Sequence, residues 1–138
     1  MTITPYMLYE DVEAAMDFLA RAFGFEEVLR HTGTQGYVNH AEMRLGGDAI
    51  YLGDPGEDYR NPGRLGGPTV LVGVDGLEDV DALCERARAA GAEISEEPTD
   101  QEYGERRFAV VDPEGHHWHF SQPIADVAPE DWGATTSG

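Results

Sequence analysis

The chain lacks lysine, has a single cysteine, and contains no apolar run long enough to cross a membrane. Its nine arginines stand against 27 acidic residues, and the net charge of -18 repels nucleic acid and anionic membranes. We therefore expect neither as a partner. Cys84 has no second cysteine to pair with, and no basic segment followed by a hydrophobic one opens the chain. Both absences predict a cytoplasmic protein without a secretory signal.

The rest of the composition is typical of a folded domain. With 138 residues, 41% of them hydrophobic, the chain is long enough to bury a core as one domain. Its acidic surface would attract cationic ligands. Solubility, adaptation to salt or a compositional bias of the source genome also explain the charge, and the absence of lysine favours such a bias. Charge alone therefore leaves the ligand open.

Hydrophobic periodicity divides the chain into two similar halves. In the first, a strand precedes a helix that Asp11 caps and Gly24 ends, and three strands follow. The second half repeats this order, with a capping box of Asp75 and Glu78 before its helix and Gly91 after it. The expected strands span residues 4–9, 25–31, 38–45, 48–52, 69–74, 93–97, 107–111 and 116–121, and residues 53–68 and 98–104 are expected to be loops.

The repeat predicts an α+β fold. Two βαβββ modules form curled mixed sheets around a shared cleft, with the helices on the outside. The single domain spans residues 1–122, with a first module at 1–53, a loop at 54–67 and a second module at 68–122. Residues 123–138 form a loosely held tail. Each sheet has one helix for two faces, so side chains opposite the helices are expected to line the cleft.

The last strand carries the most informative residues. Asp112-Pro113-Glu114-Gly115 predicts a tight turn into it, and side chains then alternate across the strand. His116, Trp118 and Phe120 are expected on the core face. His117 and His119 share the other face, which places two imidazoles toward the cleft.

These features together resemble the vicinal oxygen chelate superfamily, which contains glyoxalase I, extradiol dioxygenases, fosfomycin resistance enzymes and bleomycin resistance proteins. The resemblance covers roughly residues 3–122 and is carried by the order and duplication of several short segments. They are Leu8-Tyr9-Glu10-Asp11-Val12-Glu13-Ala14-Ala15, Phe23-Gly24-Phe25, Val74-Asp75-Gly76-Leu77, Tyr103-Gly104-Glu105-Arg106 and Asp112-Pro113-Glu114-Gly115-His116.

The resemblance also implies where a metal is held in metal-dependent members. Their ligands lie on the first and last strands of each half, and these positions correspond here to Thr4, Tyr51, Thr69 and His119. Two hydroxyls, a phenol with an ordinary pKa of about 10 and one imidazole are a poor set of ligands for a divalent ion. No metal is therefore expected at these four positions, and no other cofactor is expected.

Three interpretations of the two imidazoles remain open. In the first interpretation, His117 and His119, whose Cα atoms are about 6.5 Å apart, bind a divalent ion together with His40 or Glu42. Alternatively, His119 acts in a metal-free cleft as a general base or a hydrogen-bond donor. In the third interpretation both imidazoles are hydrogen-bonded wall residues.

The sequence thus favours a glyoxalase/bleomycin resistance-like protein that binds a small organic ligand, a cationic or aromatic antibiotic among the candidates. Its expected ligand-binding residues are Tyr6, Tyr51, Thr69, Leu71, His117 and His119. The resemblance implies a homodimer. The alternative is a glyoxalase-type lyase or isomerase, or a dioxygenase-like enzyme, with a non-standard metal site or with His119 as the catalytic base. Whether the chain is an enzyme stays open.

Overall fold

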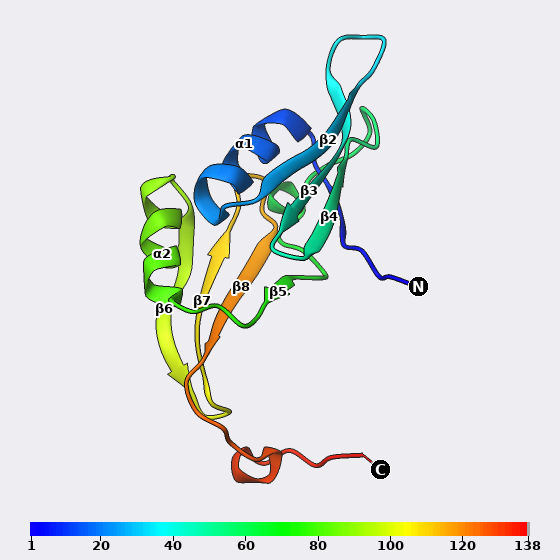
Figure 1. Ribbon diagram of the computed structural model, residues 1–138. Coiled ribbons are helices and arrows are strands. Elements are labelled where there is room, and N and C mark those ends of the chain that lie inside the picture. Colours follow the sequence, from blue (N-terminus) through cyan, green and yellow to red (C-terminus); the bar gives the residue numbers. More distant parts are fainter. Residues whose placement is uncertain (138) are drawn as a thin grey trace.

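Two four-stranded sheets, each with one long helix, make up the protein (Figure 1). The computed structural model describes residues 1–137, so the end of the predicted tail, residue 138, lies outside the described part. The strand orders are β1-β4-β3-β2 and β5-β8-β7-β6, the same connectivity used twice. This confirms the α+β class and the duplicated βαβββ module. Within residues 1–137, no helix is long and apolar enough to span a bilayer.

The elements lie close to their predicted positions. The first module contains β1 (Tyr6–Leu8), α1 (Val12–Phe23), β2 (Glu26–Thr32), β3 (Val38–Leu45) and β4 (Asp48–Gly53). The second contains β5 (Val72–Val74), α2 (Val80–Ala89), β6 (Glu93–Gln101), β7 (Glu105–Val111) and β8 (His117–Pro123). Two short 3-10 turns, η1 (Pro62–Arg64) and η2 (Pro129–Trp132), lie in the connecting loop and the tail.

Helix α1 follows the predicted local rules. Asp11 accepts a hydrogen bond from the backbone N–H of Ala14 at 3.0 Å, and Gly24 ends the helix with φ 84°. Its apolar stripe is buried against the sheet. The stripe consists of Val12, Ala15, Met16, Phe18, Leu19, Ala22 and Phe23.

Two local predictions for the second module are wrong. Helix α2 is capped by Asp79, which accepts from the N–H of Ala82 at 3.0 Å, and not by a box of Asp75 and Glu78. The predicted loop at residues 98–104 is strand β6 as far as Gln101. The register of β6 against β7 shifts between Glu96 and Thr99, and such an irregularity accommodates Pro98, which has no N–H for the ladder.

The modules are joined through their helices and through β8. Phe23 at the end of α1 contacts Trp118 and Phe120, with ring centroids 5.3 and 4.7 Å apart. Arg86 of α2 donates to the carbonyl oxygens of Arg21 and Ala20 at the end of α1, at 2.9 and 3.1 Å. The prediction that Trp118 and Phe120 face the core is therefore confirmed, and their core spans both modules.

The turn before β8 forms a second junction. The buried carboxylate of Asp112 accepts hydrogen bonds from the Tyr9 hydroxyl at 2.6 Å and the Trp118 indole N–H at 3.2 Å. Glu114 accepts from the backbone N–H groups of Glu10 and Asp11, just before α1, at 2.6 and 2.9 Å. The Asp112–Gly115 turn therefore fixes the start of α1 and with it the orientation of the first module.

Candidate functional site

The open face of each sheet, defined as the face opposite the helices, holds most of the predicted site residues. On β8 the alternation is as predicted, because Trp118 and Phe120 are fully buried while His117 and His119 are half-buried on the other side. On β4, Ile50 and Leu52 are buried and Tyr51 is half-buried. The candidate site is therefore built from two open faces, one per sheet.

The open face of the first sheet carries a cluster of rings. Tyr6 pairs with Tyr51 in the parallel β1–β4 ladder, and their rings meet edge to face at 5.6 Å. The Tyr6 hydroxyl is hydrogen-bonded to His40 Nδ1 at 2.8 Å, and His40 Nε2 lies 3.5 Å from Glu42. Gly53 leaves room for this arrangement, because a Cβ there would stand 2.7 Å from the Tyr6 ring.

One side of this cluster is open to solvent. The Tyr6 side chain is half exposed, and neighbouring Leu8 on the same face is also exposed. Stacking surfaces next to hydroxyl and imidazole groups suit a flat organic molecule. The sequence predicted the two tyrosines as site residues, whereas it placed His40 and Glu42 only as helpers of a metal.

The open face of the second sheet is more polar and less filled. His119 pairs with Gly73 on β5 and Ala109 on β7, so its neighbours on either side are small. Burial, and secondarily the nearby charge of Arg107, lowers the pKa of His119 below its ordinary value. The imidazole is therefore neutral at pH 7 and can accept a proton or donate one hydrogen bond.

Sequence reasoning missed Arg107 on this face. The register pairs Arg107 with Ser121, two residues after His119, so the guanidinium shares the face with both histidines. It donates to the Tyr103 hydroxyl at 3.0 Å. No signal in the sequence alone identifies it, because its place opposite Ser121 depends on the register of β7 against β8.

Two predicted ligand-binding residues lie outside the strands. Thr69 and Leu71 are exposed in the segment before β5, and Thr4 is half-buried in the segment before β1. The four positions of the metal ligands in related proteins are thus divided between the sheets, with Tyr51 on one and His119 on the other. Their donor set of two hydroxyls, a phenol and an imidazole does not fit a divalent ion.

The alternative metal site is not assembled either. His40 and Glu42 lie on β3 of the first sheet, whereas His117 and His119 lie on β8 of the second. Across residues 1–137, no three histidine, cysteine or acidic side chains come together in a way that would hold an ion. The described residues therefore give no geometry from which a metal-dependent step can be derived.

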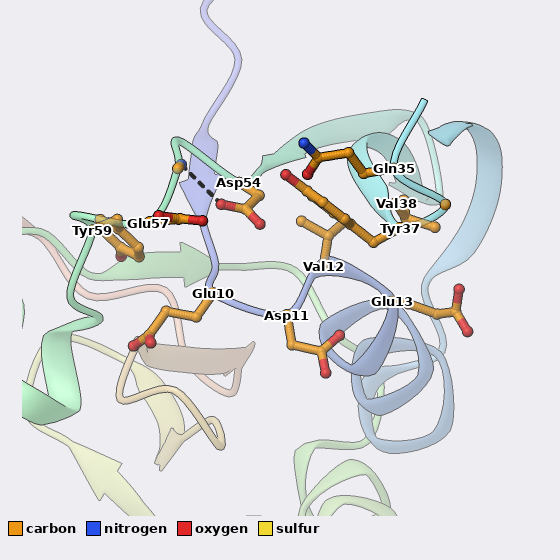
Figure 2. A pocket seen from close by; sticks show the side chains of 12 residues that line it. Glu10, Asp11, Val12, Glu13, Gln35, Tyr37, Val38, Asp54, Glu57 and Tyr59 are labelled. Atoms are coloured by element: carbon orange, nitrogen blue, oxygen red, sulfur yellow. Dashed lines mark hydrogen bonds between the residues drawn. The ribbon is translucent and has the colours of Figure 1, made fainter. Parts of the chain in front are cut away.

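A separate acidic hollow of about 690 Å³ lies between the start of α1, the β2–β3 turn and the loop after β4 (Figure 2). Several of its carboxylates already hold backbone groups. Asp11 caps α1, and Asp54 accepts from the N–H of Gly56 at 2.9 Å. Its acidic and aromatic lining consists of Glu10, Asp11, Glu13, Asp54, Glu57, Tyr37 and Tyr59. The predicted ligand-binding residues lie elsewhere, on the strands or in the segment before β5.

Comparison with known proteins agrees with this architecture. The profile of the Glyoxalase/Bleomycin resistance protein/Dioxygenase superfamily matches residues 3–120. An uncharacterized protein of Mycobacterium tuberculosis, Rv0887c, is 34% identical over 140 residues, which cover 98% of this chain and 82% of that protein.

Solved structures share the fold. The crystal structure of TioX from a Micromonospora species is 32% identical, with a TM-score of 0.71 over 90% of this chain and 99% of TioX. A glyoxalase/bleomycin resistance protein/dioxygenase from Nocardioides has a TM-score of 0.72 at 24% identity, over 100% of this chain and 90% of that one. The chain belongs to the glyoxalase/bleomycin resistance protein/dioxygenase superfamily.

Proposed function

We propose that this protein binds a small organic ligand without a metal, in the manner of the bleomycin resistance proteins in its superfamily. The observation that carries the proposal is the partly exposed ring cluster of Tyr6, His40 and Tyr51, whose centroids lie 5.6 to 5.8 Å apart. Exposed rings next to a hydroxyl and an imidazole offer stacking and a few directed hydrogen bonds. This is the chemistry of recognition for a flat, partly polar molecule.

The ligand class follows from the surroundings of the cluster. Glu42 pairs with Tyr51 across the β3–β4 ladder, and the chain as a whole carries a charge of -18. Both favour a ligand with a cationic part, and aromatic antibiotics with amino groups fit this description. Resistance by sequestration in the cytoplasm is the role that we propose for such binding.

We also propose that the binding unit is a homodimer. Tyr6, Leu8 and Leu71 are exposed apolar residues at or beside the open faces, with exposures of 53, 38 and 45%. A second copy placed over these faces would bury them and would turn two shallow faces into an enclosed site. Sedimentation analysis tests the dimer independently of any ligand.

Isothermal titration with a panel of cationic glycopeptide and aromatic antibiotics tests the proposed function. Tyr6→Ala is expected to weaken binding by about tenfold or more, because one stacking surface and one hydroxyl are lost. Tyr37→Ala is the matched control, since Tyr37 is equally exposed but lines the acidic hollow. The proposal would be contradicted if no compound gave heat, or if only Tyr37→Ala lost binding.

The lowered pKa of His119 favours a second candidate, an enzyme in which this imidazole is a general base without a metal. Such an enzyme would move a proton on a substrate held against the second sheet. Isomerisation of a glyoxalase-type hemithioacetal by the purified chain, abolished in His119→Gln, would support it. Full activity in His119→Gln excludes it, and elemental analysis of chelator-free protein separates it from a metal enzyme.

A further inference from the structure

Two adjacent arginines on β7 have very different environments. Arg106 is held by two carboxylates, with bonds of 3.0 and 3.0 Å to Asp81 and 2.9 Å to Asp100. Arg107 points to the opposite face of the strand. Its Nη2 lies 3.4 Å from both oxygens of Glu96, at the long limit of a hydrogen bond. Arg107 is thus the weakly paired member of the two.

The Nε–H of Arg107 is also unused. This nitrogen is buried and has no hydrogen-bond partner in residues 1–137. Leaving a buried donor of a charged group unpaired is unfavourable. Arg44 is likewise loosely paired, at 3.5 Å from Glu26, but its side chain is 59% exposed, so water can form hydrogen bonds to its donors. The Arg107 side chain is only 25% exposed.

Glu96 does not compensate for the unpaired Nε–H of Arg107. Its carboxylate is shared, because the Gln101 side-chain N–H also points to it at 3.4 Å. The other partner of Arg107, the Tyr103 hydroxyl, is neutral. No short contact with a carboxylate therefore satisfies the N–H donors of this guanidinium. This contrasts with the composition of the chain, in which acidic residues outnumber basic ones by three to one.

There is open space on the same face at Gly73, next to His119. His119 lies diagonally across the β7–β8 ladder from Arg107, between Gly73 and Ala109. A Cβ built on Gly73 would meet no atom within 4 Å. Since His119 is neutral at pH 7, it adds no second charge and offers a hydrogen bond next to the guanidinium.

We propose that Arg107 binds the acidic group of the ligand, a carboxylate or another planar oxyanion, on the open face of the second sheet. The guanidinium turns from its 3.4 Å contact with Glu96 to a bidentate contact with the ligand, for which its planar fork is suited. Tyr103 steadies the fork and His119 donates a further hydrogen bond. The proposal rests on the proposed function, that the open faces bind an organic molecule, and narrows its ligands to zwitterions, whose cationic part lies at the first sheet and whose acidic part lies at Arg107.

Three probes of nearly equal shape test the charge preference: benzoate, benzamide and benzamidine. The 15N-labelled chain is titrated with each, and the Arg107 Nε–H signal is followed with the Gly73 and Ala109 amides. We expect benzoate to shift all three signals with a Kd on the order of 1 mM. The neutral and cationic probes are expected to shift these second-sheet signals about tenfold more weakly or not at all.

Variants locate the effect. Arg107→Gln is expected to weaken benzoate binding about tenfold, and Arg107→Lys less, because it keeps the charge but loses the fork. Arg106→Gln is the matched control, one residue away on the other face, and should leave benzoate binding unchanged. The amide spectrum of each variant shows whether it is folded.

The outcomes separate this inference from the proposed function. Absence of benzoate binding, tighter binding of benzamidine at the Arg107, Gly73 and Ala109 signals, or benzoate binding that survives both Arg107 variants overturns the inference. An antibiotic that binds through Tyr6 without regard to Arg107 leaves the proposed function standing and the inference overturned. Loss of benzoate binding in Arg107→Gln together with unchanged binding in Arg106→Gln supports the inference.

Discussion

The open faces of the two sheets occupy equivalent places in a duplicated module but differ in chemistry. In the first sheet the pair formed by the first and last strands is Tyr6 with Tyr51, and in the second it is Gly73 with His119. On the next strand across each sheet, Glu42 pairs with Tyr51 whereas Ala109 pairs with His119. The first face is filled with rings, and the second leaves space around an imidazole.

The charged positions differ in the same way. His40 pairs with the residue two places after Tyr51, and Arg107 pairs with the residue two places after His119. The equivalent positions therefore hold a hydrogen-bonded imidazole on one sheet and an incompletely paired guanidinium on the other. The comparison teaches that one backbone, used twice, presents a cluster of rings on one sheet and an incompletely paired cation on the other, and we propose that both serve one ligand.

The largest expected effect comes from breaking the junction that holds both faces in one unit. Asp112→Ala removes the acceptor of the Tyr9 hydroxyl and the Trp118 indole N–H, both buried. We expect a loss of about 3 kcal/mol or more in the free energy of unfolding, measured in urea. Asp58→Ala, at an exposed site, is the control and should stay within about 0.5 kcal/mol of the parent chain. Equal losses in both variants would show that the junction contributes nothing special.

A smaller effect is expected for the phenol at that junction. Burial, and next the charge of Asp112, raises the pKa of Tyr9 well above its ordinary value. The folded protein therefore keeps the proton longer than the unfolded chain, and the contribution of Tyr9 to stability, present below about pH 10, is lost as the pH rises further. Tyr9→Phe should cost about 1 kcal/mol at pH 7 and should reduce the alkaline loss of stability. Identical stability curves from pH 8 to pH 11, apart from a constant offset, would contradict this reason.

The two glycines beside the site sharpen the comparison of the faces. A Cβ at Gly53 would stand 2.7 Å from the Tyr6 ring, whereas one at Gly73 meets nothing within 4 Å. Gly73→Ala is expected to be neutral or to stabilise by up to about 1 kcal/mol, because the unfolded chain loses freedom. Gly53→Ala should displace the ring from His40 and lower stability by about 1 kcal/mol. Thermal unfolding of the two variants measures this difference in stability. Equal changes in Tm would mean that the two faces are equally filled.

The smallest effect concerns one titration on the second face. The charge of Arg107 contributes to the lowered pKa of His119, although burial is the larger cause. Arg107→Gln should therefore raise the pKa of His119 part of the way to its ordinary value, as followed by the imidazole proton signals in NMR. Arg106→Gln should leave the titration where it is. A lower pKa of His119 in Arg107→Gln, or the same increase in both variants, would show that the Arg107 charge does not lower the pKa of His119.

The sequence carried most of the fold. Alternation around Trp118 and the stripe of α1 depend on local spacing, and both predict buried faces without knowledge of the partner strand. The start of α2 was misplaced because Asp75, Glu78 and Asp79 all have capping chemistry, and only the packed structure selects Asp79. The extension of β6 past Pro98 depends on a register irregularity that no local rule reveals.

The candidate site was less accessible to sequence reasoning. Tyr6, Tyr51 and His119 follow from alternation along their own strands. Arg107 does not, because its role depends on which residue of β8 it faces, and that is set by register across a turn of five residues, 112–116. Its unpaired Nε is a property of three-dimensional packing and has no counterpart in composition or motif.

The most direct test of the account is to map a bound ligand. The 15N-labelled chain is titrated with the tightest compound from the antibiotic panel, and amide shifts are assigned along β1, β4, β7 and β8. We predict shifts centred on Tyr6, Tyr51, Arg107 and His119, on both open faces at the same ligand concentration. Shifts confined to the acidic hollow near Glu57 and Tyr37, with no shifts on either open face, would contradict the claim that the two open faces bind the ligand.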